Sequence, residues 1–163
     1  MPRLGILSKF FVNVGTPTTA PSFVELPLIS DCTVNGPWDE GEASTREGQV
    51  TQTENTKMSL EISGKIRIKK AASNAAYLKM RASHGTGSSF EVLVLNGGLT
   101  ENGAEGYQFM AKIFNWSEDQ SLGTVLYKDF TIKPCIWNSP ESAPRIALVV
   151  GTVLGYSAIG STT

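Results

Sequence analysis

Apolar and polar residues alternate with a period of two between Lys57 and Lys69. The polar positions carry mostly Lys, Arg and Ser, and the apolar positions are Met58, Leu60, Ile62, Ile66 and Ile68. Because successive side chains of a strand point to opposite faces, this pattern predicts one long β-strand with a buried face and a polar, cation-rich face. Gly64 falls among the apolar positions and predicts a bend or a close backbone approach.

Several shorter segments carry the signals of further strands. They are 9–15, an extended segment over 24–34 with Pro27 at an edge or bend, 90–95, 107–116, and 124–132 followed by Pro134. Large apolar side chains occupy both parities of 107–116, which predicts that both faces of this strand are covered. The stretch from Ile146 to Ile159 is apolar but interrupted by glycines, and it predicts a strand or docking tail rather than a membrane span.

Turns, one long loop and one helix are expected between these strands. Asn35-Gly36-Pro37 is a strong turn signal, and 117–123 is a second expected turn region. The polar stretch from Trp38 to Thr56 predicts a long loop with a short strand at 43–46. Residues 71–82 have the propensity of a helix that ends at Ser83-His84-Gly85. The expected fold class is mainly β, with one α-helix, a long polar loop and an apolar tail.

Length and charge narrow the class of protein. The 163 residues suit one β domain over 1–145, followed by an apolar C-terminal arm over 146–163. Fourteen Lys and Arg against fifteen Asp and Glu leave a net charge of -1, which disfavours tight binding of nucleic acid. The N-terminus has no apolar run with a cleavage site, so no secretory signal peptide is expected. Cys32 and Cys135 are expected as buried or half-buried thiols, and a disulfide would require neighbouring strands.

Candidate catalytic residues are few. His84 is the only histidine, and no nucleophile motif accompanies it, so a surface or capping role is expected. The carboxylates at 39–42 and 118–119 are expected to be solvated, because no apolar pocket adjoins them in the sequence. The glycine-containing segments lack the spacing of a phosphate-binding loop. The sequence therefore predicts no enzyme, no catalytic residue, no metal site and no cofactor.

Three tryptophans leave one alternative open. Trp38, Trp116 and Trp137 would suit a carbohydrate-binding β-sandwich module if their rings formed an exposed platform. Aromatic residues of all-β chains are more often core or interface residues, which favours a structural role.

The order of several short segments is informative across Phe10 to Trp137. The segments are Ile29–Val34, Gly41–Arg46, the following loop, the alternating strand at 57–69, the helix at 71–82 and Thr131–Pro134. In this order they resemble the major tail tube protein of long-tailed bacteriophages, or of the wider injection-tube superfamily. The resemblance implies an antiparallel β-sandwich or half-barrel with one flanking α-helix, a long loop and extended terminal arms. It also implies a structural virion protein whose homo-hexameric rings stack head to tail into a hollow tail tube, through which phage DNA passes during ejection.

The resemblance also implies partners and a location. The chain would contact copies of itself and the tape-measure and tail-terminator proteins, would assemble in the host cytoplasm into the virion tail, and would meet no membrane. DNA would transit the lumen without specific binding. The family offers no counterpart for 146–163. Another virion or secretion-machine tube protein, or a decoration protein, is the remaining alternative.

Two interaction surfaces follow for this chain. The resemblance implies an inter-ring loop at Glu47, Gly48, Gln49, Val50, Thr51, Gln52, Thr53, Glu54, Asn55 and Thr56. An inter-subunit basic face is expected at Lys57, Lys65, Arg67 and Lys69. A lumen that lets a polyanion slide should lack rows of Lys and Arg, so we expect another strand to line it, and this basic face to meet an acidic surface of a neighbour.

Overall fold

The structure is a computed structural model that describes residues 9–17, 20–27, 29–42, 53–67, 73–119, 126–135 and 143–159. One helix and a series of strands make up these residues. In chain order they are β1 (Lys9–Asn13), β2 (Phe23–Glu25), β3 (Ile29–Asn35), β4 (Trp38–Glu42), β5 (Thr53–Met58), β6 (Glu61–Arg67), α2 (Ala75–Thr86), β7 (Phe90–Leu95), β8 (Glu105–Asp119), β9 (Tyr127–Pro134), β10 (Arg145–Val150) and β11 (Val153–Ala158).

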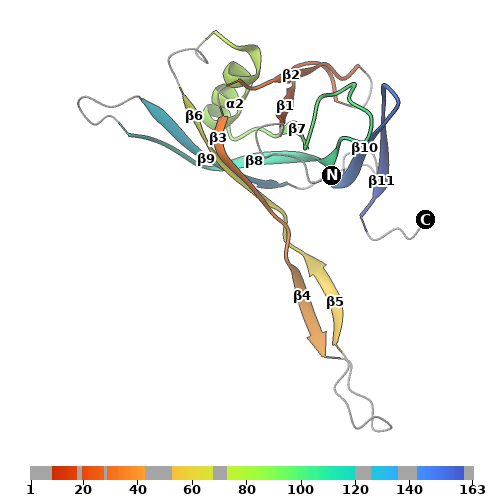
Figure 1. The fold of residues 1–163 in the computed structure, drawn as a ribbon. Helices are drawn as coiled ribbons and strands as arrows, with labels where there is room; N and C mark the ends of the chain where they lie inside the picture. Colours follow the sequence, from red (N-terminus) through yellow and green to blue (C-terminus); the bar gives the residue numbers. More distant parts are fainter. Residues whose placement is uncertain are drawn as a thin grey trace, which may run out of the picture.

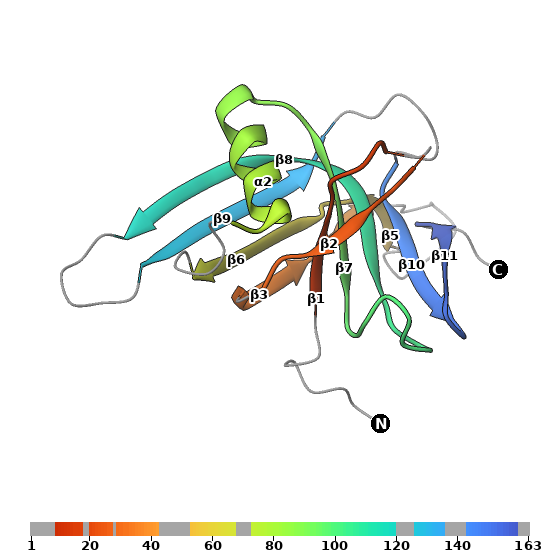
Figure 2. The ribbon, with the colours of Figure 1, turned by 90° about the horizontal axis from the view of Figure 1, so that it is seen from above.

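Nine of the strands form one antiparallel sheet, in which β2-β1-β7-β8-β9-β6-β3 are neighbours in that order (Figures 1 and 2). The long strand β8 pairs with β7 along one edge. Its other edge pairs first with β10, at Tyr107 opposite Ile146, and then with β9, at Ile113 opposite Ile132, so the sheet forks there. Over the described residues the sheet does not close into a barrel. The expected class, mainly antiparallel β with one flanking helix, is confirmed.

Two hydrophobic clusters lie on opposite faces of this sheet. The larger cluster lies beneath α2 and includes Phe10, Ile62, Met80, Phe109 and Phe130. The smaller cluster joins β1 and β7 to β10, and its members are Phe11, Leu93, Leu95, Ala104, Ala147 and Val149. Because β7 contributes to both clusters, all its side chains are buried, in agreement with the short apolar strand expected at 90–95.

The helix α2 begins and ends at residues other than those expected. Asn74 is its N-cap, and the Asn74 side-chain oxygen accepts hydrogen bonds from the backbone N–H groups of Ala76 and Tyr77. The helix continues through Ser83-His84-Gly85 to Thr86, and Gly87, whose φ of 68° is in the left-handed region, is its C-cap. The predicted C-terminal cap was therefore wrong, because the left-handed residue that terminates the helix comes two positions later.

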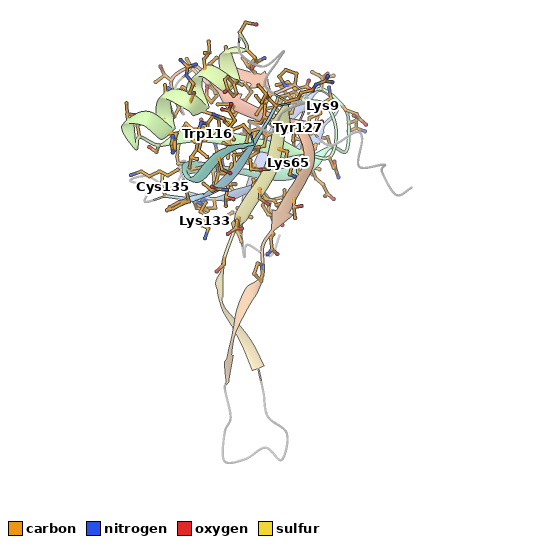
Figure 3. All side chains as sticks on the ribbon, turned by 90° about the vertical axis from the view of Figure 1, so that its left-hand side faces the viewer. Lys9, Lys65, Trp116, Tyr127, Lys133 and Cys135 are labelled. Atoms are coloured by element: carbon orange, nitrogen blue, oxygen red, sulfur yellow. The ribbon has the colours of Figure 1, made fainter. Side chains whose placement is uncertain are left out.

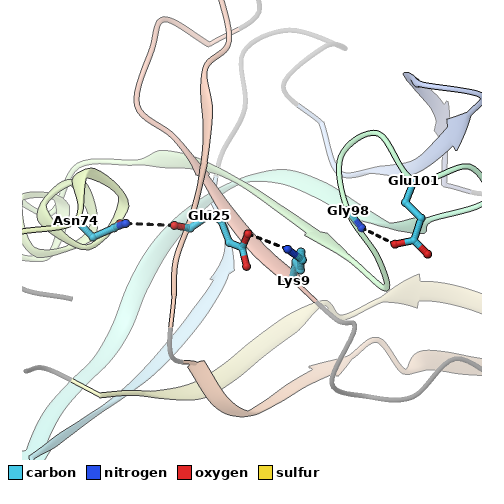
Figure 4. A network of polar contacts seen from close by, with 5 residues as sticks. All are labelled: Lys9, Glu25, Asn74, Gly98 and Glu101. Carbon is cyan, nitrogen blue, oxygen red and sulfur yellow. Dashed lines mark hydrogen bonds and ion pairs between the residues drawn. The ribbon is translucent and has the colours of Figure 1, made fainter. Parts of the chain in front are cut away.

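Polar contacts fix the start of α2 against the first two strands (Figure 4). The Lys9 ammonium lies 3.0 Å from a Glu25 carboxylate oxygen, which joins β1 to β2. The Asn74 side chain also donates a hydrogen bond of 3.3 Å to the backbone carbonyl of Glu25. One asparagine thus caps the helix and attaches it to the edge of the sheet.

A β-bulge in β8 explains why large apolar residues occupy both parities of this strand. The pairing with β9 shifts register between Ile113 and Asn115, so Phe114 is the extra residue. Before the bulge, the odd-numbered residues Phe109 and Ile113 pack beneath α2, and after it the even-numbered Trp116 does so. The apolar parity changes because the backbone inserts a residue, and the outward-facing Phe114 is left exposed.

The expected loop at 38–56 is in part a two-stranded ribbon. The strand expected at 57–69 is divided at Ser59-Leu60 into β5 and β6, and β5 pairs with β4 while β6 pairs with β3. The predicted turn at 35–37 was wrong, because the Pro37 carbonyl accepts a hydrogen bond from the Ser59 N–H and the paired chains continue past it. The short strand expected at 43–46 lies outside the described residues.

Within β6 the predicted alternation is confirmed. Ile62, Gly64 and Ile66 are buried, whereas Lys65 and Arg67 are exposed. Gly64 is a position of close approach, because a Cβ there would lie 3.1 Å from the Phe130 ring. The glycine therefore leaves room for the phenyl ring of the adjacent strand β9.

The structure also differs from the turn expected at 117–123 and from the strand bounds expected at 124–132. Residues 117–119 belong to β8 and pair with the start of β9, where Asp119 is opposite Tyr127. Residues 120–125 lie outside the described residues. As expected, β9 ends at Pro134. The single extended segment expected at 24–34 is instead divided into β2 and β3, on either side of Pro27.

The apolar C-terminal stretch folds as a hairpin. β10 and β11 pair with each other around Gly151, whose φ of 65° suits a tight turn, and β10 also pairs with β8. Ala147 and Val149 point into the smaller cluster, and Leu154 packs against it.

Candidate functional site

A ribbon of two strands leaves the body of the protein and is the first candidate functional feature. β4 and β5 continue the directions of β3 and β6 and form an arm that points away from the rest of the sheet (Figure 1). Among the described residues, these two strands pair only with each other. Because isolated two-stranded hairpins are marginally stable in water, a surface that receives the arm would stabilise it.

The sequence of this arm is acidic. β4 contains Asp39, Glu40 and Glu42, and β5 contains Glu54 and Lys57. Of the expected inter-ring loop, Thr53 to Thr56 belong to β5, and 47–52 lie outside the described residues. An excess of carboxylates on an extended ribbon favours a cationic receiving surface.

The expected basic face is a second candidate, and the structure describes part of it. Lys65 and Arg67 are exposed on β6, on the face of the sheet opposite α2. Lys65 and Lys133 lie on the body above the arm in Figure 3. The side chain of Lys57 and the whole of Lys69 lie outside the description.

Acidic residues accompany the cations on this face. The Lys65 ammonium lies 3.9 Å from an Asp129 carboxylate oxygen, and the Lys133 ammonium lies 3.1 Å from a Glu61 carboxylate oxygen. These pairs are half-exposed and are therefore weak contributors to stability. Arg67 and the paired lysines leave a polar surface whose charge is mixed rather than uniformly basic.

Trp116 lies in an aromatic cluster and not on an open platform. Its ring centroid is 5.8 Å from that of Tyr77 and 5.9 Å from that of His84, both on α2. The Lys128 ammonium lies 5.0 Å from the Trp116 ring centroid and 2.9 Å from a Glu118 carboxylate oxygen. These contacts occupy Trp116 and disfavour a sugar-stacking role. The Trp38 side chain and Trp137 lie outside the description.

His84 is exposed on the last turn of α2, in agreement with the expected surface role. Within the part of the chain that the structure describes, no group of three or more His, Cys, Asp or Glu side chains could hold a metal ion. No helix in the same part is long and apolar enough to cross a membrane. Cys32 and Cys135 are half-buried and form no disulfide, and burial raises the pKa of the Cys32 thiol to about 11.

A buried polar chain across five strands is a feature that the sequence reasoning missed. The Glu91 carboxylate is 3% exposed, and it accepts a hydrogen bond of 2.7 Å from the Asn13 amide and another from the Gln108 amide. The Gln108 oxygen accepts a hydrogen bond of 3.0 Å from Arg145 Nε, and the Arg145 guanidinium stacks 3.8 Å from the centre of the Tyr156 ring. In the sequence, the only sign of these buried polar contacts was a glutamate inside the apolar run 90–95.

The electrostatics of Tyr156 reflect this position. Burial raises the pKa of Tyr156, and the nearby Glu91 carboxylate acts in the same direction. The Arg145 charge and a hydrogen bond with Gln108 oppose that rise in pKa. The polar chain therefore links β1, β7 and β8 to the C-terminal hairpin and fixes where β10 and β11 dock.

Replacing Glu91 with alanine is expected to lower the free energy of unfolding by about 1–3 kcal/mol, because the Asn13 and Gln108 amides would lose their buried acceptor. Urea denaturation followed by circular dichroism measures the change. Glu105→Ala, at an exposed position of β8, is the control and should stay within about 0.5 kcal/mol. Equal stabilities of the two variants would contradict a structural role for the polar chain.

We compared the sequence and the fold with those of known proteins. No family model and no curated protein matches the sequence. A chain from the tail of an empty gene transfer agent particle, refined with C6 symmetry, has a TM-score of 0.60 at 13% identity, covering 91% of this chain and 96% of that one. A chain from the virion of a native gene transfer agent has a TM-score of 0.65 at 12% identity, covering 96% of this chain and all of that one.

The SPP1 tail tube gives a similar result, with a TM-score of 0.66 at 9% identity, covering 96% of this chain and 81% of that one. At such identities the likeness is one of fold. The chain therefore has the fold of tail-tube proteins, as the order of its sequence segments indicated.

Proposed function

We propose that the chain is the structural subunit of a virion tail tube, in which copies close into hexameric rings and the rings stack into a hollow tube that DNA passes through. The arm carries this proposal: a ribbon that pairs only with itself among the described residues suits an element that becomes ordered against a neighbouring subunit. The shared fold with chains of tail particles supports it further. In this role the protein would be non-enzymatic and would reside in the virion tail.

The arm and the basic face form a complementary pair of surfaces in this proposal. The segment Glu47–Thr56 at the end of the arm would reach the next ring, and the acidic residues of β4 would meet Lys57, Lys65, Arg67 and Lys69 of a neighbour. Opposite charges at such a contact would set the register between subunits more than they would add affinity. The low net charge of the chain suits a lumen that DNA crosses without being held.

The remaining partners follow from the role. Tape-measure and tail-terminator proteins would contact the inside and the end of such a tube, and assembly would take place in the host cytoplasm.

Negative-stain electron microscopy of the purified full chain over a range of concentrations tests the proposal. We expect rings or hollow rods of uniform width with sixfold averages. Rings of another symmetry would favour a related secretion tube or decoration protein. A chain that stays monomeric at every concentration and whose tryptophan fluorescence responds to glycans would contradict the proposal in favour of a carbohydrate-binding module.

A further inference from the structure

The outer face of the C-terminal hairpin is a bare apolar stripe. It consists of Ile146, Leu148, Val150 and Val153, whose exposed fractions are 37%, 42%, 66% and 69%. The cross-strand pairs Ile146–Ser157, Leu148–Gly155 and Val150–Val153 place all these positions on one face, and none of them is charged. A contiguous apolar face of this kind on an outer strand pair is typical of an interaction site.

Gly155 makes a depression in the middle of this stripe. A Cβ built at Gly155 would have only the Leu148 carbonyl oxygen within 4 Å, at 3.6 Å, so the space above this glycine is open. Leu148 is its cross-strand neighbour, and Val153 and Ser157 flank it along β11. A ring placed over a glycine in a strand fills such a space without displacing a side chain.

Phe114 on β8 is a second exposed apolar feature, and it is aromatic. Its exposed fraction is 64%, so the three most exposed large apolar side chains of the described residues are Val153, Val150 and Phe114. The bulge in β8 aims it outward, and the Lys133 ammonium lies 5.8 Å from its ring centroid. Exposed, positioned aromatic residues are frequent energetic anchors of protein interfaces.

We propose that a second copy of the chain covers the apolar stripe, with its Phe114 seated over Gly155. Within one copy, Phe114 lies where β8 pairs with β9, whereas the hairpin pairs with the opposite half of β8, and Phe114 remains exposed. Figure 2 shows β10 and β11 on one side of the body and the far ends of β8 and β9 on the other. Two different surfaces of one chain that complement each other generate a head-to-tail contact, which is the kind that rings need.

This contact rests on the proposed self-assembly and names one of its interfaces. It is separate from the arm, because it uses uncharged side chains of the body. It gives the C-terminal hairpin a role in lateral association between copies.

Gly155→Val tests the depression with little expected effect on the single copy. The φ of Gly155 is outside the left-handed region and the added side chain meets open space, so the melting temperature should not fall. A valine would fill the depression, and we expect association measured by sedimentation velocity to weaken about tenfold or more. Phe114→Ala should weaken it to a similar extent. Gly85→Ala, with no atom within 4 Å of its new Cβ, is the matched control and should leave association unchanged.

The double variant decides whether the two residues meet. If Phe114 seats over Gly155, the losses from Gly155→Val and Phe114→Ala are not additive, and the double variant associates about as weakly as either single one. Additive losses, or unchanged association in either single variant, would overturn the proposal.

Electron microscopy of the same samples separates this proposal from that of the tube. Rings or rods whose formation neither variant affects would overturn the contact and leave the tube proposal standing. Coupled losses in a sample that forms other oligomers would support the contact and contradict the tube. A wild-type chain that stays monomeric would overturn both.

Discussion

Replacing Phe130 with alanine is expected to lower the free energy of unfolding by about 3–5 kcal/mol. The Phe130 side chain is 1% exposed, and its ring centroid lies 5.6 Å from that of Phe10 on β1. Its ring also fills the space that Gly64 leaves on β6. The truncation would open a cavity in the larger cluster, where β9 packs against β1 and β6. Urea denaturation would measure the loss of unfolding free energy.

Two further variants define this effect. Thr131→Ala, at the next position of β9 and on the opposite face of the sheet, is the control and should change the free energy of unfolding by less than about 1 kcal/mol. Gly64→Val should destabilise by about 1–3 kcal/mol, because its side chain would collide with the Phe130 ring. A loss below about 1 kcal/mol in Phe130→Ala would contradict the packing of β6 against β9.

Removing the arm is expected to abolish tube formation while the body still folds. The Pro37 carbonyl and Ser59 N–H are hydrogen-bonded across the ribbon, so residues 38–58 can be replaced by Asn-Gly to close a two-residue hairpin there. The cluster beneath α2 retains Leu60 and its other members. Electron microscopy would then show no rods, and thermal unfolding would still show one cooperative transition.

Lys79→Ala, at an exposed position of α2, serves as the control for assembly and should form rods as the unmodified chain does. Rods of normal length from the chain without the arm would contradict the proposed role of β4 and β5. Loss of the unfolding transition would instead show that the arm contributes to the stability of the body.

Local sequence signals predicted some elements well. The bounds of β7 match the expected 90–95, because an apolar run flanked by polar and glycine residues marks both ends. The alternation in β6 also placed its buried and exposed residues correctly. The helix was displaced, since its start depends on the Asn74 cap and its end on the left-handed Gly87 rather than on average propensity.

Features that depend on distant pairing were not visible in the sequence. Gly36-Pro37 is a turn signal by itself, but the Pro37 carbonyl accepts a hydrogen bond from the Ser59 N–H, and the two chains continue past this point as a pair. The bulge at Phe114 arises only where β8 is aligned with β9. The chain of polar residues around Glu91 requires β1, β8 and β10 to meet, and these strands are far apart in the sequence.

The predicted interaction surfaces also depend on strands that are distant in the sequence. Lys65 and Arg67 are exposed as their parity indicated, but the ion-pair partner of Lys65 is Asp129 on β9, which the pattern of β6 alone does not reveal. The assignments of Lys57, Lys69 and the segment Glu47–Thr56 stay predictions. The sequence thus indicated the exposed side of β6 but not the charges that other strands add to it.

The arm also has a mechanical consequence. It continues the axes of β3 and β6, so a force applied to its end acts along these strands (Figure 1). The hydrogen bonds of antiparallel pairs are perpendicular to the strands, and a load that pulls β3 and β6 together shears the ladder between β6 and β9. Bonds loaded in shear resist together rather than breaking one after another, so tension on the arm is distributed across the body.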